Sequence, residues 1–340
     1  MIGNGFDLRL GMKTKFSDMY EDYLSKEPPT DVIRRFKEAL RLDAPRYETW
    51  GDFEIAMAQY ASNFSSENEL VSCVRDFKDH MGNHLRKEQF ALIEYINSNS
   101  GALACAKEME RSMHAFHEGQ TPNVINAIEA LGDLHHAYFK FITFNYTNLL
   151  SQILQYRNGY YKDGDDNLPI HVHGRLDTDV VLGIDSVSQL GELPYNLTRR
   201  GERAFIKPSF NSMFDSARVK AAAKTLKESE VICIYGMSLG QSDKTWVNII
   251  YEWLTENPNH HLVYFKYLDQ QFSALRRDEM MDIEDDQRDE LLKKLCDSEV
   301  LDGLENQVHI PIGYDIFNFR NAIEADAKNR KQYSTPGSMK

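Results

Sequence analysis

Four short clusters of glycine and polar residues occur in this sequence, each at a point where an apolar run of strand type ends. Their members are Gly3, Asn4, Gly5 and Asp7; Asn145 and Tyr146; His171, His173 and Gly174; and Gly236, Ser238 and Asp243. A short Gly-x-Gly turn lets backbone amides approach a pyrophosphate, and amide and imidazole side chains can hold a sugar or a water molecule. The coincidence of the four clusters predicts one nucleotide-binding crevice.

Asn145 and His173 are the candidates for chemistry within these clusters. An asparagine side chain both donates and accepts hydrogen bonds and does not titrate, so Asn145 is expected to orient a water or a ribose hydroxyl, or else to cap a turn. A histidine can act as a base or hydrogen-bond partner near neutral pH. His171 lies on the same face of the predicted strand. We prefer His173, which directly precedes Gly174, and interpret His171 as a core histidine.

The first cluster raises two questions. A carboxylate beside a phosphate repels it, so Asp7 either accepts hydrogen bonds from sugar hydroxyls or nearby amides, or is purely structural. Only Met1 and Ile2 precede Gly3, whereas a strand usually takes about five residues. Either the natural chain starts further upstream, which is the interpretation we favour, or neighbouring elements cover the gap. The longer glycine fingerprint of dehydrogenases is missing.

Composition excludes several classes of protein. A net charge of −13 without any basic block disfavours nucleic acid as the main ligand. No run approaches the roughly 18 apolar residues that cross a bilayer, and no secretion signal is present at the N-terminus, so we expect a cytoplasmic protein without membrane contact. The four cysteines are scattered, at spacings that do not suit zinc, and no metal site is predicted.

The spacing of apolar residues indicates the elements that must position the clusters. Residues 15–135 show helical periodicity almost throughout. Strands are predicted at 138–144, 168–172, 180–184, 231–235, 262–268 and 308–312, and helices at 149–156, 211–228, 243–256, 271–279, 286–297 and 315–328. This alternation favours an α/β fold, a parallel sheet with helices on both faces and ligands at the carboxyl ends of the strands.

Several motifs resemble those of the AbiH family of bacteriophage abortive-infection proteins. They are Ile2-Gly3-Asn4-Gly5-Phe6-Asp7-Leu8 with Thr14, Trp50-Gly51-Asp52-Phe53-Glu54, Phe144-Asn145-Tyr146-Thr147, His173-Gly174, and Gly236-Met237-Ser238 with Ser242-Asp243. The resemblance covers the chain to about residue 320. Thr14 is expected to be the N-cap of a helix beginning at Lys15.

AbiH proteins are in turn similar to the sirtuin-like group, whose bacterial defence members hydrolyse NAD. The resemblance implies a Rossmann-like, mostly parallel sheet formed by residues 1–14 and 136–328, a large helical insertion at 15–135 and a flexible tail at 329–340. It implies catalytic roles for Asn145 and His173. Cofactor contacts are implied for Gly3, Asn4, Gly5, Gly236 and Ser238, and the predicted binding set is completed by Asp7, Tyr146, Gly174 and Asp243.

Two departures from the sirtuin pattern bear on function. Phe144 and Thr147 replace the usual Thr and Asp around the asparagine, and the paired-cysteine zinc module is missing, which favours NAD cleavage over protein deacylation. The expected function is anti-phage defence through hydrolysis of NAD, without a metal, triggered by a phage or host protein. A nucleotide-binding sensor or regulatory subunit without catalysis, or an interaction scaffold, is the alternative. A homo-oligomer is also left open.

Overall fold

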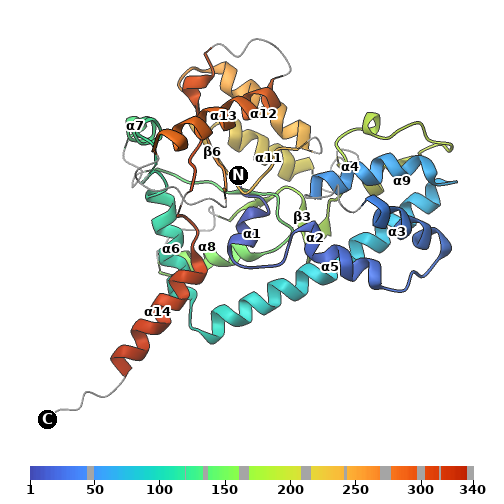
Figure 1. Cartoon of the computed structure of the whole chain (residues 1–340), viewed down its shortest axis with the longest axis horizontal. Coiled ribbons are helices and arrows are strands. Elements are labelled where there is room, and N and C mark those ends of the chain that lie inside the picture. Colours follow the sequence, from blue (N-terminus) through green and yellow to red (C-terminus); the bar gives the residue numbers. More distant parts are fainter. Residues whose placement is uncertain are drawn as a thin grey trace.

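The computed structural model is largely helical, with small sheets near its centre (Figure 1). It describes residues 1–43, 50–118, 120–132, 137–160, 168–207, 216–240, 243–268, 277–296, 303–313 and 315–334. The helices are α1 (Gly5–Arg9), α2 (Phe16–Ser25), α3 (Asp31–Asp43), α4 (Trp50–Tyr60), α5 (Glu67–Ser98), α6 (Ala102–His114), α7 (Pro122–Ala130), α8 (Leu149–Tyr160), α9 (Arg199–Phe205), α11 (Ser216–Lys227), α12 (Lys244–Glu256), α13 (Arg277–Leu295) and α14 (Phe319–Ser334). The strands are β1 (Ile142–Thr143), β2 (Ile170–His171), β3 (Gly174–Arg175), β4 (Asp179–Val180), β5 (Val231–Tyr235), β6 (His261–Phe265) and β7 (Val308–His309).

A parallel sheet joins both ends of the sequence through Ile2. β1 pairs with β2, and β6 pairs with β5 and β7, all in parallel. Ile2 forms parallel bridges to Thr143 and to Tyr235, so the opening segment lies between β1 and β5. From one edge to the other the order is β2, β1, the segment at Ile2, β5, β6 and β7. Because all of these run the same way, their carboxyl ends meet at one edge.

Both faces of this sheet are covered by helices. Side chains alternate between the faces of a strand, so neighbouring residues of β5 and β6 enter different apolar cores. Tyr235 and Phe265 belong to a core shared with α6, α7, α8 and α14. Ile234 and Leu262 belong to a second core, shared with α11, α12 and α13. This double covering is typical of parallel sheets.

The predicted helical block at 15–135 packs in two places. α2, α3, α4 and the first part of α5 enclose an aromatic core in which the Phe53 and Phe77 rings stack with centroids 4.0 Å apart. The far end of α5, with Leu92 and Ile96, joins α6 and α7 against the sheet instead. Figure 1 shows α5 running between these two parts of the molecule. The second half of the block is therefore part of the layer that covers the sheet.

Most predicted elements have a counterpart, with shifted ends. The strands predicted at 168–172, 231–235, 262–268 and 308–312 correspond to β2, β5, β6 and β7, and the one at 138–144 shortens to β1. The helices predicted at 149–156, 243–256 and 315–328 correspond to α8, α12 and α14. Within the described residues, the helix predicted at 211–228 corresponds to α11. The two helices predicted at 271–279 and 286–297 correspond to one continuous helix, α13. Residues 211–215, 271–276 and 297 lie outside the described part of the chain.

The prediction of a parallel strand at 180–184 is wrong. Asp179 and Val180 form β4, which pairs antiparallel with β3 and lies outside the parallel sheet. Gly174, the first residue of β3, adopts a φ of +77°, a backbone conformation that favours glycine, and the chain reverses at residues 176–178 to enter β4. Leu182 and Ile184 then pack into the aromatic core of the helical part. Their apolar character comes from contact with helices.

Two predictions about helix ends also differ from the structure. The N-cap of α2 is Lys15, and Thr14 is engaged elsewhere, with its Oγ1 donating to Asn4 Oδ1 at 2.6 Å. α14 continues to Ser334, past residue 329, where the tail was predicted to begin; residues 335–340 lie outside the described chain. Across the described ranges, no helix combines the length and apolar character needed to span a membrane.

Candidate functional site

A cavity of about 580 Å³ lies at the carboxyl ends of the parallel strands. Four segments that follow strands line it, together with the start of α2 and residues from α4 and the segment after α9. The predicted site residues among its walls are Gly3, Asn4, Gly5, Asp7, Asn145, Tyr146, His173, Gly236, Ser238 and Asp243. The sheet thus brings together residues that are far apart in the sequence. A volume of this size is typical of small-molecule and cofactor sites, which occupy about 300–1,000 Å³.

The glycines of the first and fourth clusters allow two loops to touch. A Cβ atom added to Gly5 would lie 2.4 Å from Gly236 Cα, and one added to Gly3 would lie 2.6 Å from Gly236 O. The amide of Gly5 donates to Gly236 O at 3.0 Å, and that of Gly3 donates to Tyr235 O at 2.9 Å. Both amides are therefore occupied within the protein, and the two glycines serve loop packing.

Asn4 is held by Thr14, which comes from the segment before α2. Asn4 Nδ2 donates to Thr14 O at 3.0 Å, while Asn4 Oδ1 accepts from the Thr14 hydroxyl. Both ends of the Asn4 amide are engaged in this pairing, which ties the first loop to the helical part. The Asn4 side chain thus shapes the cavity wall.

Asp7 is a buried carboxyl group within α1, with only 2% of its surface exposed. Its Oδ2 accepts a hydrogen bond from Thr147 Oγ1 at 2.7 Å. Its Oδ1 is buried as well. Burial raises the pKa of Asp7 to about 7, against the opposing effects of the Thr147 hydroxyl and the Asn145 side chain.

Asn145 is fixed through its backbone. Its amide donates to Thr143 Oγ1 at 3.2 Å, and its carbonyl lies 3.4 Å from His171 Nδ1. The side chain is 7% exposed. The Asn145 side chain lies next to the Asp7 carboxyl group in the cavity wall, where a hydrogen bond between the two side chains lowers the pKa of Asp7.

The two histidines of the third cluster have different surroundings. His171 is buried outside the cavity wall, with Nε2 2.9 Å from Ser151 Oγ, which fits its interpretation as a core residue. His173 lines the cavity between Phe144, edge-on at 5.1 Å, and Tyr146, stacked at 6.2 Å between ring centroids. Burial, with the positive charges of Lys207 and Arg218, holds the pKa of His173 well below its usual range. Its ring is therefore neutral at pH 7.

Tyr146 and Gly174 contribute differently to the site. The Tyr146 ring forms part of the cavity wall beside His173. Its hydroxyl donates to Val181 O at 3.1 Å and so is engaged within the protein. Gly174 is not among the residues that line the cavity. A Cβ atom there would lie 2.0 Å from Asp179 O, so this glycine is needed for the close pairing of β3 with β4.

An ion cluster in the wall joins the predicted Asp243 to two residues that were not predicted as part of the site, Lys207 and Glu54. Lys207 Nζ lies 3.1 Å from Glu54 Oε2 and 3.5 Å from Asp243 Oδ1. Glu54 Oε1 also accepts the Gly183 amide at 2.9 Å. Burial alone lowers the pKa of Lys207, but the carboxylates of Glu54, Asp243 and Asp185 raise it above its usual range. Lys207 is therefore fully charged and already compensated by carboxylates.

Glu54 and Thr147 could have been predicted as site residues from the sequence. Each belongs to a motif that was quoted for the family resemblance, Trp50 to Glu54 and Phe144 to Thr147, but neither was assigned a role. Lys207 is buried in the wall, 4% exposed, although an isolated lysine in a sequence usually lies at the surface. Its carboxylate partners come from different segments, which no local pattern indicates.

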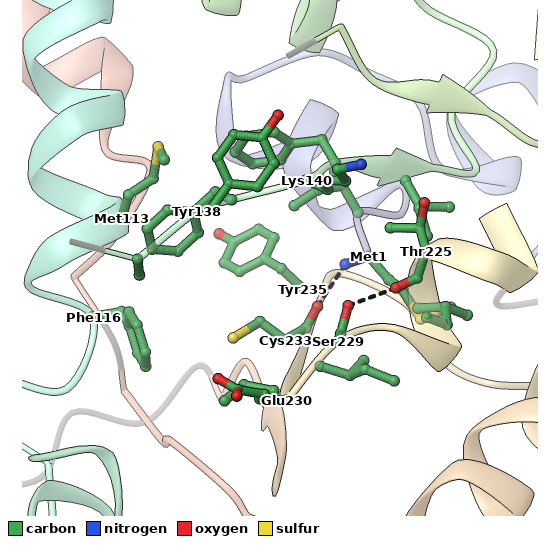
Figure 2. Close-up of a pocket in the computed structure, with 18 of the residues that line it drawn as sticks. Met1, Met113, Phe116, Tyr138, Lys140, Thr225, Ser229, Glu230, Cys233 and Tyr235 are labelled. Carbon is green, nitrogen blue, oxygen red and sulfur yellow. Dashed lines mark hydrogen bonds between the residues drawn. The ribbon is translucent and has the colours of Figure 1, made fainter. Parts of the chain in front are cut away.

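A second cavity of about 740 Å³ lies at the opposite edge of the sheet, beside the start of β5 (Figure 2). Aromatic and aliphatic side chains dominate its walls, including Phe116, Tyr138 and Tyr235. The ammonium of Met1 donates to Cys233 O at 2.6 Å, as Figure 2 shows. This cavity is larger, but it contains none of the predicted site residues.

Comparison with known proteins gives one family. The model of the family described as Bacteriophage abortive infection AbiH matches residues 1–265, a span that includes every residue lining the carboxyl-end cavity. No curated protein and no solved structure matches the chain. Within the described residues, no group of three or more His, Cys, Asp and Glu side chains is arranged to hold a metal ion.

Proposed function

Because the chain belongs to the AbiH family of bacteriophage abortive-infection proteins, we propose that it defends against phage by hydrolysing NAD to nicotinamide and ADP-ribose. The observation that carries this proposal is the cavity at the carboxyl ends of the strands. It gathers residues of four separate turns, among them Asn145 and His173, around a hollow of the size that a cofactor needs.

The order of the strands supports a dinucleotide as the ligand. Numbered along the chain with Ile2 as the first strand, the order is 3-2-1-4-5-6. Doubly wound dinucleotide-binding folds share this order and bind their ligand where it reverses, between the first and fourth strands. Gly3 and Gly236 follow these two strands here. We take the sheet to be Rossmann-like and of the sirtuin-like kind.

The reaction mainly requires positioning. Nicotinamide leaves as a neutral molecule, and the ribose passes through a state with oxocarbenium character. In this proposal Asn145 orients the attacking water or a ribose hydroxyl, and His173, a neutral ring in the same wall, contacts the ribose. The carboxylates of the buried Glu54 and the partly buried Asp243 place negative charge in the wall, which favours a developing positive charge on the sugar.

The diphosphate needs donors other than the amides of Gly3 and Gly5, since both donate within the protein. Lys15, Phe16 and Ser17, at the start of α2, line the same cavity. The N-terminus of a helix favours anions, and the Lys15 ammonium adds a positive charge there. We therefore place the diphosphate between the first turn and the start of α2.

The direct test is to incubate the purified protein with NAD and measure free nicotinamide, with and without an extract of phage-infected cells as the activator. We expect Asn145→Ala and His173→Ala to lower nicotinamide release by at least about 100-fold. Asn259→Ala is the matched control, because it changes an asparagine in the turn after α12, outside the cavity wall. Equal release by the wild type and both site variants would overturn the catalytic assignment.

A non-catalytic NAD sensor is the second candidate, and the surroundings of His173 favour it. The ring is enclosed by Phe144 and Tyr146, and its depressed pKa makes it a weak base. Calorimetry distinguishes the two functions: tight binding of NAD with no nicotinamide under any condition supports the sensor. Loss of that binding in Asn145→Ala would place the ligand in the carboxyl-end cavity.

A further inference from the structure

We propose that His171 is a positioning residue for Asn145: its Nδ1–H holds the Asn145 backbone carbonyl, and Ser151 keeps the imidazole in the form that can do so. This inference rests on the proposed hydrolysis of NAD and deepens it, because it adds to the site a buried histidine that does not line the carboxyl-end cavity. The role of His171 is to set where the Asn145 side chain lies in the cavity wall.

His171 contacts both the segment of Asn145 and the helix that follows this segment. It is the last residue of β2, is 9% exposed, and has Thr143 of β1 as its register partner. Its Nδ1 lies 3.4 Å from Asn145 O, and its Nε2 lies 2.9 Å from Oγ of Ser151, in the first turn of α8. One ring therefore connects the segment after β1 to the start of α8.

The two contacts determine which ring nitrogen of His171 carries the hydrogen. A carbonyl oxygen only accepts hydrogen bonds, so Nδ1 is the nitrogen that donates to Asn145 O. Burial lowers the pKa of His171 to about 4, so the ring is neutral at pH 7 and its Nε2 accepts from the Ser151 hydroxyl. Ser151 thus selects the tautomer in which His171 can hold Asn145.

The backbone of Asn145 is held on both sides by the paired strands. Its amide donates to Thr143 Oγ1 at 3.2 Å, and its carbonyl accepts from His171. Thr143 and His171 are partners in the register of β1 and β2, so the sheet itself fixes the orientation of this backbone. A short side chain follows its backbone closely, and these contacts therefore also place the Asn145 amide in the cavity wall.

The test compares two replacements of His171 that keep different nitrogen atoms. The amide nitrogen of asparagine is as many bonds from Cβ as Nδ1 is, and that of glutamine is as many bonds away as Nε2. We expect His171→Gln, which loses the hydrogen bond to Asn145 O, to lower kcat for nicotinamide release by about 10- to 100-fold in the activated full-length protein. His171→Asn keeps that bond and should stay within about threefold of the wild type.

A purely structural role of His171 predicts the opposite order. Asparagine is smaller than histidine and leaves a void in the core, whereas glutamine is close to histidine in volume, so His171→Asn should be the less stable variant. If His171 positions Asn145, urea denaturation and kcat rank the two variants oppositely. A His171→Asn variant that loses as much kcat as His171→Gln, or more, overturns the inference.

Ser151→Ala and two matched controls test the rest of the arrangement. Ser151→Ala removes the hydroxyl that selects the tautomer and should lower kcat about 3- to 10-fold. Ser62→Ala changes an exposed serine after α4 and is its control. His260→Gln is the control for His171, because His260 Nδ1 also contacts a backbone carbonyl, Trp253 O at 2.6 Å, outside the cavity wall. Neither control should change kcat.

The Asn145→Ala variant shows whether His171 acts through Asn145. Once the Asn145 side chain is removed, nothing is left to position, so adding His171→Gln should lower the residual kcat by less than about twofold. The residual release of nicotinamide is measured at a correspondingly higher protein concentration. A further loss as large as the one in the wild-type background means that His171 acts independently, and it overturns the inference.

Calorimetry with NAD separates this inference from the function on which it rests. No nicotinamide from the activated wild type overturns the hydrolysis, and NAD affinity then replaces kcat as the readout. Weaker binding of NAD by His171→Gln than by His171→Asn supports the positioning role, and equal binding by the two variants overturns it. A wild type that neither binds nor cleaves NAD overturns both.

Discussion

At the carboxyl ends of the strands, a cavity of about 580 Å³ is lined by charged and polar side chains, among them Asp7, Glu54, Asn145 and Lys207. At the amino ends of the same sheet, a cavity of about 740 Å³ is lined mainly by aromatic and aliphatic side chains. Its buried Met1 ammonium donates to Cys233 O, and burial lowers the pKa of that group to about 6. The larger cavity therefore offers mainly apolar surface, whereas the smaller one offers polar and charged side chains. The smaller one is therefore the cavity in which we propose that the reaction takes place.

The largest effect is expected at the ion cluster of the carboxyl-end cavity. Lys207→Met leaves the buried carboxylate of Glu54 and the partly buried carboxylate of Asp243 without their cation, so the free energy of unfolding should fall by about 3–5 kcal/mol. The control is Lys294→Met on α13, which breaks an exposed pair with Glu290 and should cost no more than about 0.5 kcal/mol. Urea denaturation measures both values. Similar small losses in the two variants would mean that the cluster contributes little.

The buried Asp7 carboxyl group should lower the free energy of unfolding above neutral pH. Burial raises its pKa from 3.8 to about 7, so the folded protein binds a proton more tightly than the unfolded chain does. Below about pH 4 the Asp7 carboxyl group is protonated in both states, and its contribution to the free energy of unfolding is complete. As the pH rises to about 7 only the unfolded chain loses the proton, so the free energy of unfolding falls by at most about 4 kcal/mol. Asp7→Asn should therefore be more stable than the wild type at pH 8, with a difference that vanishes towards pH 4. Denaturation curves at pH 4, 6 and 8 test this, and a wild type that is the more stable protein at pH 8 would contradict it.

The glycines of the two cavities allow a matched comparison. Gly236 and Gly132 both have positive φ angles, +69° and +106°, so alanine strains the backbone at either position. A Cβ atom at Gly236 would lie 2.6 Å from Gly5 Cα, whereas none of the described atoms lies within 4 Å of one at Gly132. Gly236→Ala should therefore cost about 1–3 kcal/mol more than Gly132→Ala. Thermal and urea denaturation give the difference, and equal costs would show that the two loops can separate.

The contrast between the two ends also shows how far the sequence alone leads. Polar side chains and glycines after apolar runs were enough to predict the turns at residues 145–146 and 236–238, because the end of a strand has a local signature. β5 was predicted with its observed ends for the same reason. At residues 3–7 a turn was predicted, but the chain enters the short helix α1 at Gly5. The first strand could not be predicted in this way, because Ile2 is held in the sheet by its pairing with Thr143 and Tyr235 and not by an apolar run around it in the sequence.

Long-range contacts explain what was missed. Glu54 lies on α4 and Lys207 follows α9, and nothing in either segment indicates that the two meet in the cavity wall. The run at 180–184 has the apolar character of a strand, but that character reflects packing against helices. Whether Asp7 was structural or faced a ligand could not be decided without its partner, Thr147, which is distant in the sequence. In each case the missing information was which segments pack together.

The smallest effect is expected at the amino-end cavity, where added apolar volume should stabilise the protein. Cys233 lines this cavity and is half-buried on the face that packs against α6 and α14, so Cys233→Leu should bury additional apolar surface. We expect the free energy of unfolding to rise by about 0.5–1 kcal/mol, with nicotinamide release unchanged, because the cavity is at the opposite edge of the sheet from Asn145. Cys233→Ser, of similar size but polar, should give no such gain. A leucine variant that loses nicotinamide release while remaining folded would show that the two cavities are coupled, and that the amino-end cavity takes part in function.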